Sequence, residues 1–427
     1  MIRVTMAPAG LIALALAGPL TGQSLSSRIE SVRDGMAGLQ FPVRPDVCGH
    51  GTSYIRIGNG TFVGDGVWIN QNDDVVANDC EPGPARVLLT RSEGRTVNLK
   101  VGIGGGAWPE GTRDLGEVGS REAADYFLAL ARELDGRLGR EALLPAVLAE
   151  GAEVWRGLLE ISRNRALSRG LRESATGWLG REALKTPSAA GEIVAALRQL
   201  AEDREESAGL RTRAVRSIAR LDGQATAALV SLADANDPVI SRAAFQSLGR
   251  SADPRARDAL RRKVREGTIP EGSRKAAIEA LGGRDAVAAD FALLREIWPR
   301  LTDEASREGV INALAEAGGA ENLRWLLAQS GDSQMSVSDR GRAIRGAVRA
   351  GATTADLIRL YDAGQDRRVK DALIEAMGRI GDRAAVDKLI QIARDDTDPQ
   401  IRRRAVNRLS RSSDERAIAA LKAMVEK

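Results

Sequence analysis

The chain has 427 residues, enough for two or three domains or for one long array of repeats. Its apolar fraction of 43% supports a packed core, and the low aromatic fraction of 3% favours helices packed through alanine and leucine. The net charge is only +4, and no long block carries one sign, so we expect no nucleic-acid binding, which ordinarily needs a strongly basic surface.

Residues 1–22 have the pattern of a secretory signal peptide. Arg3 supplies a positive start, and 6–20 is an apolar run followed by polar residues. The run is short and contains Pro8 and Pro19, which favours a signal peptide over a membrane anchor or an ordinary buried helix. We therefore expect an exported protein, periplasmic or extracellular, with no transmembrane segment in the mature chain.

Two cysteines, Cys48 and Cys80, are the only pair in the chain. Export would place them in an oxidising compartment, where a disulfide is favoured. Zinc is the competing interpretation, but a closed zinc site needs four ligands and His50 is the only histidine. We predict a disulfide that closes a loop of about 30 residues and stabilises it by about 3 kcal/mol, and no metal site.

Residues 23–40 are expected to form a short lead segment, in part helical, and residues 41–110 a small β-rich module. Alternating apolar runs bounded by glycine, proline and asparagine predict strands at 54–57, 67–69, 85–90 and 96–101. The last two should form a hairpin, with its turn at Glu93-Gly94. A module this small would depend on the disulfide for much of its stability.

From residue 120 onward the apolar period becomes helical. Ser120 is expected to be the N-cap of a helix over 121–138, and a second amphipathic helix is expected over 141–148. Because self-similar units follow, we place an α-solenoid over 120–427, with clear repeats from residue 153.

The repeats can be aligned on a large apolar residue that closes a helix. These anchors recur at spacings of 29 to 39 residues, at Leu179, Ile218, Leu248, Leu281, Leu314, Val348, Met377 and Leu409. A small or branched residue stands four positions earlier, and we call this set the Ala column: Ala175, Ala214, Ala244, Ala277, Val310, Ile344, Leu373 and Ala405.

Two further columns were not used for the alignment and therefore test it. Seven residues before the Ala column stand residues suited to an N-cap, with Pro270 and Val337 as departures: Ser168, Ser207, Asp237, Asp303, Asp366 and Asp398. Asp253, Asp382 and Asp414 follow an anchor by five residues and should cap the other helix of the unit. Each unit is therefore expected to consist of helix A, a short loop and helix B.

A basic residue, the Arg column, stands three positions before the Ala column, with Ser241 and Gly341 as departures. Its members are Arg172, Arg211, Arg274, Arg307, Lys370 and Arg402. An Asp in the loop with an Arg in the second helix resembles short HEAT repeats, such as those of phycobilisome-lyase-like HEAT proteins. The resemblance covers roughly residues 153–427. It implies a mainly α fold, a right-handed α-solenoid of about eight two-helix repeats after the β-rich module. We interpret the Arg column as structural, paired with cap aspartates, rather than as a ladder for an acidic partner.

A solenoid of this kind predicts an exported scaffold or adaptor that binds a protein or peptide partner along the surface lined by helix B. Polar helix-B positions are the candidates: Arg242, Gln246, Lys275, Glu279, Asn312, Arg403 and Asn407. No catalytic residues stand out, since His50 neighbours the predicted disulfide and no Gly-x-Ser-x-Gly motif occurs. We thus expect no enzyme and no small-molecule cofactor. The alternative is an enzyme or enzyme accessory, lyase-like by the resemblance, with its activity in or near the β-rich module.

Overall fold

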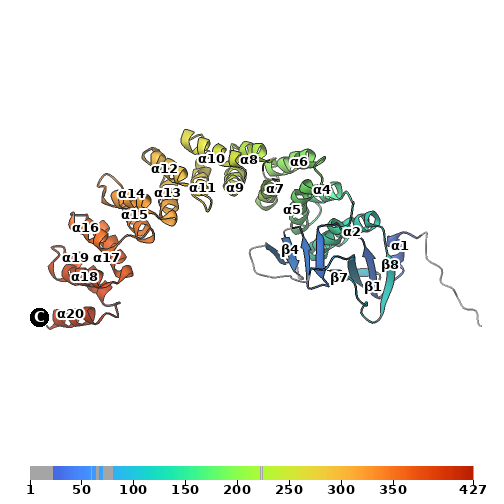
Figure 1. Ribbon diagram of the computed structural model, residues 1–427, viewed down its shortest axis with the longest axis horizontal. Helices are drawn as coiled ribbons and strands as arrows, with labels where there is room; N and C mark the ends of the chain where they lie inside the picture. The colour runs from blue at the N-terminus through green and yellow to red at the C-terminus, as the bar shows by residue number, and fades with distance from the viewer. Residues whose placement is uncertain are drawn as a thin grey trace, which may run out of the picture. The chain divides into compact units, whose positions relative to one another are not determined.

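The computed structural model describes residues 23–58, 60–63, 67–70, 80–221, 223 and 225–426. The signal peptide expected at 1–22 lies outside these residues. The chain forms two compact units, residues 1–182 and 183–427, and the division falls within helix α5 (Arg169–Lys185). All strands of the described part belong to the first unit (Figure 1). None of its helices combines the length and the apolar character needed to cross a bilayer.

The first sheet has the strand order β7-β6-β1-β8. Strand β1 (Gly35–Phe41) lies at its centre, antiparallel to β6 (Ala85–Ser92) and parallel to β8 (Thr112–Glu117). Strands β6 and β7 (Arg95–Ile103) form the hairpin expected from the sequence. Inward positions of β6 alternate with outward ones, which is the period-2 pattern of a strand covered on one face.

The second sheet is an antiparallel meander. It consists of β2 (Val47–His50), β3 (Tyr54–Ile57), β4 (Gly60–Val63) and β5 (Val67–Asn70) in that order. Strands β3 and β5 confirm the two short strands expected at 54–57 and 67–69.

The lead segment expected at 23–40 is only partly what the sequence indicated. Helix α1 (Leu25–Glu30) is present and is capped by Ser24, but β1 begins at Gly35 within the same segment. The β-rich region therefore spans 35–117 rather than 41–110. The two glycines of β1 weaken the alternation of apolar and polar side chains that would have predicted this strand. One of them, Gly38, is required by packing, since a Cβ there would lie 2.8 Å from Cδ2 of Trp108.

Helices α2 (Ser120–Leu134) and α3 (Gly136–Leu148) belong to the same unit, and α3 packs against β6 and β7. The ring centroids of Phe41 and Phe127 lie 6.2 Å apart in the core between β1 and α2. Two expectations were wrong. Gly119, not Ser120, is the N-cap of α2, and α2 ends at Leu134 because Asp135 and Gly136 have φ of 44° and 46°.

The remaining helices form pairs in which helix A is even-numbered and helix B odd-numbered. The pairs are α4 (Trp155–Arg163) with α5, α6 (Ala190–Glu202) with α7 (Ala208–Ala219), α8 (Thr226–Ala233) with α9 (Pro238–Leu248), α10 (Pro254–Glu266) with α11 (Arg274–Leu281), α12 (Ala288–Ile297) with α13 (Glu304–Ala317), α14 (Ala320–Gly331) with α15 (Val337–Arg349), α16 (Thr354–Asp362) with α17 (Arg367–Ile380), and α18 (Arg383–Asp395) with α19 (Pro399–Leu409). Helix α20 (Glu415–Val425) follows them. These eight pairs confirm the solenoid predicted by the sequence.

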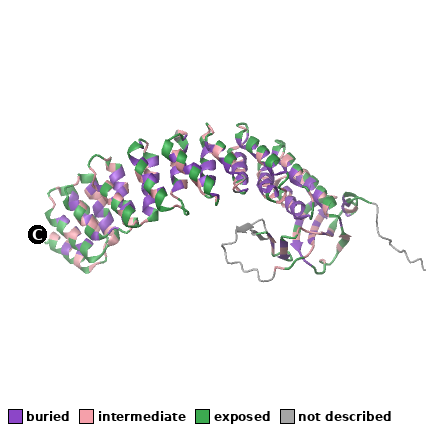
Figure 2. Cartoon of the chain, turned by 45° about the horizontal axis from the view of Figure 1, so that its top comes forward, coloured by how far each residue is buried: buried purple, intermediate pink, exposed green. Residues whose placement is uncertain are grey.

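The core of the solenoid follows the predicted columns. Every residue of the Ala column has a relative exposure of 0%, and every anchor except the half-buried Val348 is buried. Figure 2 shows the buried positions along the contacts between helices and the exposed ones on the outside of each row. Small residues in the Ala column let neighbouring helices approach closely, as the low aromatic content suggested.

The alignment was wrong by one residue in α15. Its N-cap is Ser336, whose Oγ accepts from the amide of Asp339, so Val337 is the first helical residue. Ile344 is fully buried, but Ala343 is as well, so apolar pattern alone fits both alignments. In this repeat the residues that belong to the cap, Arg, Ala and anchor columns are therefore Ser336, Arg340, Ala343 and Ala347. They replace Val337, Gly341, Ile344 and Val348, which lie one residue further along. The other departure, Pro270, precedes a 3-10 turn (Glu271–Ser273) that leads into α11.

Within the second unit the two rows of helices are packed differently. Successive helices B contact one another much more extensively than successive helices A do. Figure 1 shows α7, α9, α11, α13 and α15 along the inner side of this row of pairs, with their helices A outside. A closely packed helix-B row beside a more open helix-A row is the geometry of a curved stack.

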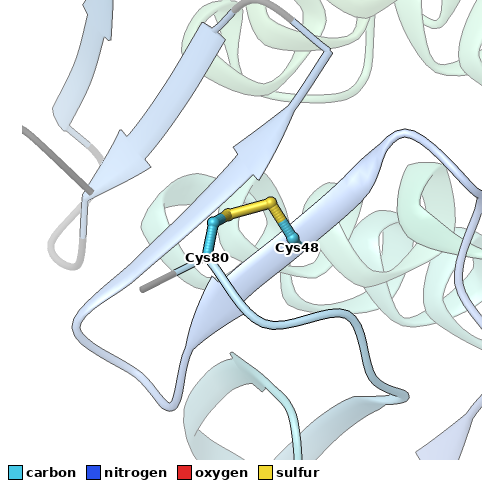
Figure 3. The surroundings of a disulfide bond; sticks show 2 residues. All are labelled: Cys48 and Cys80. Carbon is cyan, nitrogen blue, oxygen red and sulfur yellow. A yellow bond between two sulfur atoms is a disulfide. The ribbon is translucent and has the colours of Figure 1, made fainter. Parts of the chain in front are cut away.

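The predicted disulfide is present between Cys48 of β2 and Cys80, which precedes β6 (Figure 3). The backbones of the adjoining residues, Gly49 and Glu81, exchange two hydrogen bonds of 3.0 and 3.1 Å. The covalent link and this bridge together join the second sheet to the segment that enters the first.

Replacing Cys48 and Cys80 together by serine should destabilise the first unit by about 3 kcal/mol, because the unfolded chain regains the entropy of the closed loop. Hydrogen exchange should accelerate in β2, β3 and the adjoining part of β7, while α17 and α19 exchange as before. The matched control is Ser53→Ala, in the exposed turn between β2 and β3. Two thiols titrating in the denatured, unreduced protein would contradict the assignment.

Candidate binding surface of the helical repeats

Arg211 shows what the Arg column does. Its Nε donates to the carbonyl of Ala201, in the last turn of α6, at 2.9 Å. Its Nη2 donates to Oδ2 of Asp237, the N-cap of α9, at 2.6 Å. One side chain, 7% exposed, therefore satisfies a carbonyl at the end of its own helix A and binds the cap of the next repeat.

The same two contacts recur along the solenoid. Carbonyls at the end of the preceding helix accept hydrogen bonds in four further pairs: Arg172 with Ser162, Arg307 with Leu301, Arg340 with Ser330, and Arg402 with Asp396. Carboxylates of the next repeat or its loop are bound in another four: Arg274 with Asp303, Arg307 with Asp339, Arg340 with Asp366, and Lys370 with Asp396. Arg340 belongs to this column, whereas Gly341 was expected to interrupt it. Ser241, an uncharged residue at the same position in α9, donates to the carbonyl of Ala233 at 2.7 Å and so makes the hydrogen bond to the end of helix A. Arg-column donors that make these hydrogen bonds are not available to bind a partner protein.

The helix-A row is linked by side chains of a different kind. Oγ1 of Thr226 donates to Asp253 at 2.6 Å, and Oγ1 of Thr354 donates to Asp382 at 2.8 Å. In both pairs the aspartate is the N-cap of the next helix A. These links connect neighbouring helices A that share little packing surface.

A buried carboxylate joins α10 to α12. Asp290 has a relative exposure of 0% and accepts from Nε of Arg261 at 2.7 Å and from Nε of Arg257 at 3.0 Å. Burial alone would raise the pKa of Asp290. Hydrogen bonds from Arg261, the Val287 amide and Arg257 outweigh it and hold the pKa below the ordinary aspartate value. Arg257 and Arg261, two of the basic residues of α10, thus have a structural role.

The predicted binding residues lie on α9, α11, α13 and α19, all in the helix-B row. Five of them are exposed, namely Arg242, Gln246, Glu279, Arg403 and Asn407, whereas Lys275 and Asn312 are half-buried. The structure brings Lys275 to 3.8 Å from Glu279 and to 3.2 Å from Glu308 of α13. The remaining candidates are spread along the row and do not form one compact site.

One group of arginines was not predicted as a binding site, and we call it the arginine surface: Arg345 and Arg349 of α15, Arg379 of α17, Arg408 of α19, and Arg411 in the turn that follows α19. With α15 in its correct alignment, Arg345 stands two residues after the Ala column, where Gln246, Glu279 and Asn407 stand in other repeats. Six residues after the column, at the end of helix B, arginine recurs at Arg220, Arg250, Arg349, Arg379 and Arg411. This column was visible in the sequence once the register was right.

A cavity of about 280 Å³ lies between α17 and α19, next to the arginine surface. Its polar lining comprises Asp371, Glu375, Arg404, Asn407, Arg408 and Arg411. Of the predicted binding residues, Asn407 is the one that lines it. A second cavity, of about 410 Å³, lies in the first unit, and its lining includes four prolines, Pro42, Pro45, Pro82 and Pro84. Over the described ranges, no three His, Cys, Asp or Glu side chains gather in a way that could hold a metal ion.

Two stretches of the chain, residues 194–282 and 354–427, match the family model of HEAT repeats. These two stretches of the helical solenoid are HEAT repeats. The matched stretches run from within α6 to the end of α11 and from α16 to the end of the chain, and the first of them contains both Arg211 and Asp237. No curated protein sequence matches the chain significantly.

Several solved structures resemble part of the chain. Human deoxyhypusine hydroxylase is 19% identical over 56% of this chain and 92% of its own, with a TM-score of 0.27. The CpcE–CpcF complex of phycocyanin lyase from Nostoc sp. PCC7120 is 19% identical over 63% and 94%, with a TM-score of 0.23. A designed armadillo repeat protein in complex with the peptide (KR)4 is 15% identical over 63% and 100%, with a TM-score of 0.20. At TM-scores this low, the similarities support no statement about function.

Replacing Arg211 by glutamine should destabilise the helices around α7 by about 2 kcal/mol at neutral pH, because Asp237 and a helix-end carbonyl lose a charged donor. Burial alone would raise the pKa of Asp237, but hydrogen bonds from Arg211 and the Val239 amide hold it below the ordinary value. The ionised carboxylate therefore stabilises the fold above about pH 4, and this stabilisation is lost as the pH falls through the lowered pKa.

Hydrogen exchange in α6, α7 and α9 measures the effect locally, which suits a repeat protein. The difference between Arg211→Gln and the unaltered protein should be largest at neutral pH and shrink below about pH 4. Arg216→Gln, at an exposed position of the same helix, serves as the control and should have little effect. An equal effect of both substitutions would show that the Arg211 bridge is not the cause.

Proposed function

We propose that this protein is a noncatalytic scaffold that binds a protein or peptide partner along the helix-B surface of its HEAT repeats. The observation that supports this most directly is a row of exposed polar side chains two residues after the Ala column. The row includes Arg216, Gln246, Glu279, Arg345, Glu375 and Asn407, with the half-buried Asn312 between them.

Most of the packing that holds the repeats together comes from other side chains. Stacking depends on the Ala column, the anchors and the bridges of the Arg column, all of which point into the helix contacts. The row two residues after the Ala column instead recurs once per repeat on the inner helices, whose close packing brings successive members near one another. An extended chain can therefore contact many repeats at once, which is how solenoid surfaces bind their partners.

We also propose that the protein acts outside the cytoplasm. The apolar run of residues 6–20 and the Cys48–Cys80 disulfide support this, since structural disulfides persist in oxidising compartments. The protein recovered from the periplasm or the medium should lack about 22 N-terminal residues by intact mass. Recovery of the full-length chain from the cytoplasm alone would contradict export.

Photo-crosslinking in the native cell tests the scaffold. A photoreactive residue at Gln246 or at Asn407 should capture the same partner, identified by mass spectrometry, because both positions lie exposed on helices B. Arg262 and Gln391, exposed on helices A, are the matched controls. Crosslinks to one protein from both helix-B positions, and not from the helix-A positions, support the proposal. Capture only from helix A, or from no position, would refute it.

A further inference from the structure

The arginine surface differs from the rest of the solenoid in how little negative charge it contains. Its five guanidinium groups lie on three successive inner helices and in the turn after the last of them, and all except Arg408 are exposed. Glu375 is 3.3 Å from Arg408 and 3.6 Å from Arg379, so these two arginines share one carboxylate. The basic side chains of the Arg column, by contrast, each bind a carboxylate or a helix-end carbonyl.

The other three members have no carboxylate partner among the described residues. Arg349 donates to the neutral amide oxygen of Asn312 at 2.7 Å. Arg345 and Arg411 make no side-chain hydrogen bond or ion pair within the described part of the chain. Burial, followed by the positive charges of Arg342, Arg379 and Arg349, lowers the pKa of Arg345, with Glu308 acting in the opposite direction. The surface thus concentrates like charges that an anionic group would relieve.

We propose that the arginine surface binds an extended acidic segment of the partner protein. The proposal rests on the scaffold function above and specifies the chemistry of what the scaffold holds. Guanidinium groups suit carboxylates because they can donate two parallel hydrogen bonds to one carboxylate.

The spacing of the helices fits an extended chain. Packed helices lie about 8–10 Å apart, and an extended chain advances about 3.3 Å per residue. Acidic residues about three positions apart would therefore meet α15, α17 and α19 in turn. The cavity of about 280 Å³ between α17 and α19 offers room for one side chain of the segment.

Two features favour a peptide over a polynucleotide. Oδ1 of Asp371, in the cavity lining, is buried and accepts no hydrogen bond, although Arg404 lies 3.4 Å away. A peptide amide can donate to this oxygen, whereas a phosphodiester backbone has no donor. The sequences of α15, α17 and α19 also contain no aromatic residue on which a base could stack.

The test uses the full mature chain and a fluorescein-labelled 12-residue peptide with glutamate at every third position and glycine and serine between. Binding is measured by anisotropy, beside a lysine analogue and a 12-nucleotide single strand of DNA. The variant is R345Q/R379Q/R411Q. The control R324Q/R383Q/R394Q removes three exposed arginines from α14 and α18, in the helix-A row, and so changes the net charge equally. Circular dichroism checks that both variants remain folded.

We expect the glutamate peptide to bind, and its affinity to fall about tenfold or more in the variant but less than about twofold in the control. Failure of the glutamate peptide to bind, an equal loss in both variants, or tighter binding of the DNA would each overturn the proposal. The crosslinking experiment separates the two ideas. A partner still captured at Gln246 and Asn407 by a protein that does not bind the glutamate peptide would leave the scaffold standing and refute the acidic segment.

Discussion

Stacking of the repeats depends on the bridge that the Arg column makes. Each loop between helix A and helix B leaves carbonyls unpaired at one end and amides unpaired at the other. The cap aspartate satisfies the amides, and the arginine four residues later satisfies a carbonyl. The arginine also binds the aspartate of the next repeat, as Arg211 binds Asp237. The same arginine and aspartate side chains therefore pair the backbone groups at the helix ends and link one repeat to the next. Apolar packing brings the helices together, and this bridge fixes how far each repeat is displaced along the next.

The solenoid could be predicted because its signal recurs, so that errors in one repeat are corrected by the others. Where a segment has no repeat to be compared with, its pattern of apolar residues is not enough to predict its structure. Strand β1 was missed because its glycines hide the alternation, and its pairing with β6 and β8 depends on residues far away in the chain. In α15 the apolar pattern fits two registers, since Ala343 and Ile344 are both fully buried, and only the cap at Ser336 distinguishes them.

That one-residue error also concealed the arginine surface. Arg340 appeared to lie outside the structural column, and Arg345 outside the exposed row, so neither position could be interpreted. With the register corrected, arginines of two kinds separate by position. Those four residues after the cap are buried or half-buried and paired, whereas those near the end of helix B are mostly exposed and poorly paired. Residue type alone does not distinguish them, which explains why the candidate site was predicted less well than the fold.

The unequal packing of the two rows has a mechanical consequence. Close-packed helices resist compression, so the helix-B row acts as the stiff edge of the stack. The helix-A row is joined largely by side-chain links, such as Thr226 with Asp253, which can lengthen or turn without loss of a core. A load that bends the second unit would therefore be absorbed on the helix-A side, while the intervals between neighbouring helices B stay nearly constant. The exposed polar side chains on the helix-B face would thus keep a nearly constant spacing from one repeat to the next when the second unit bends.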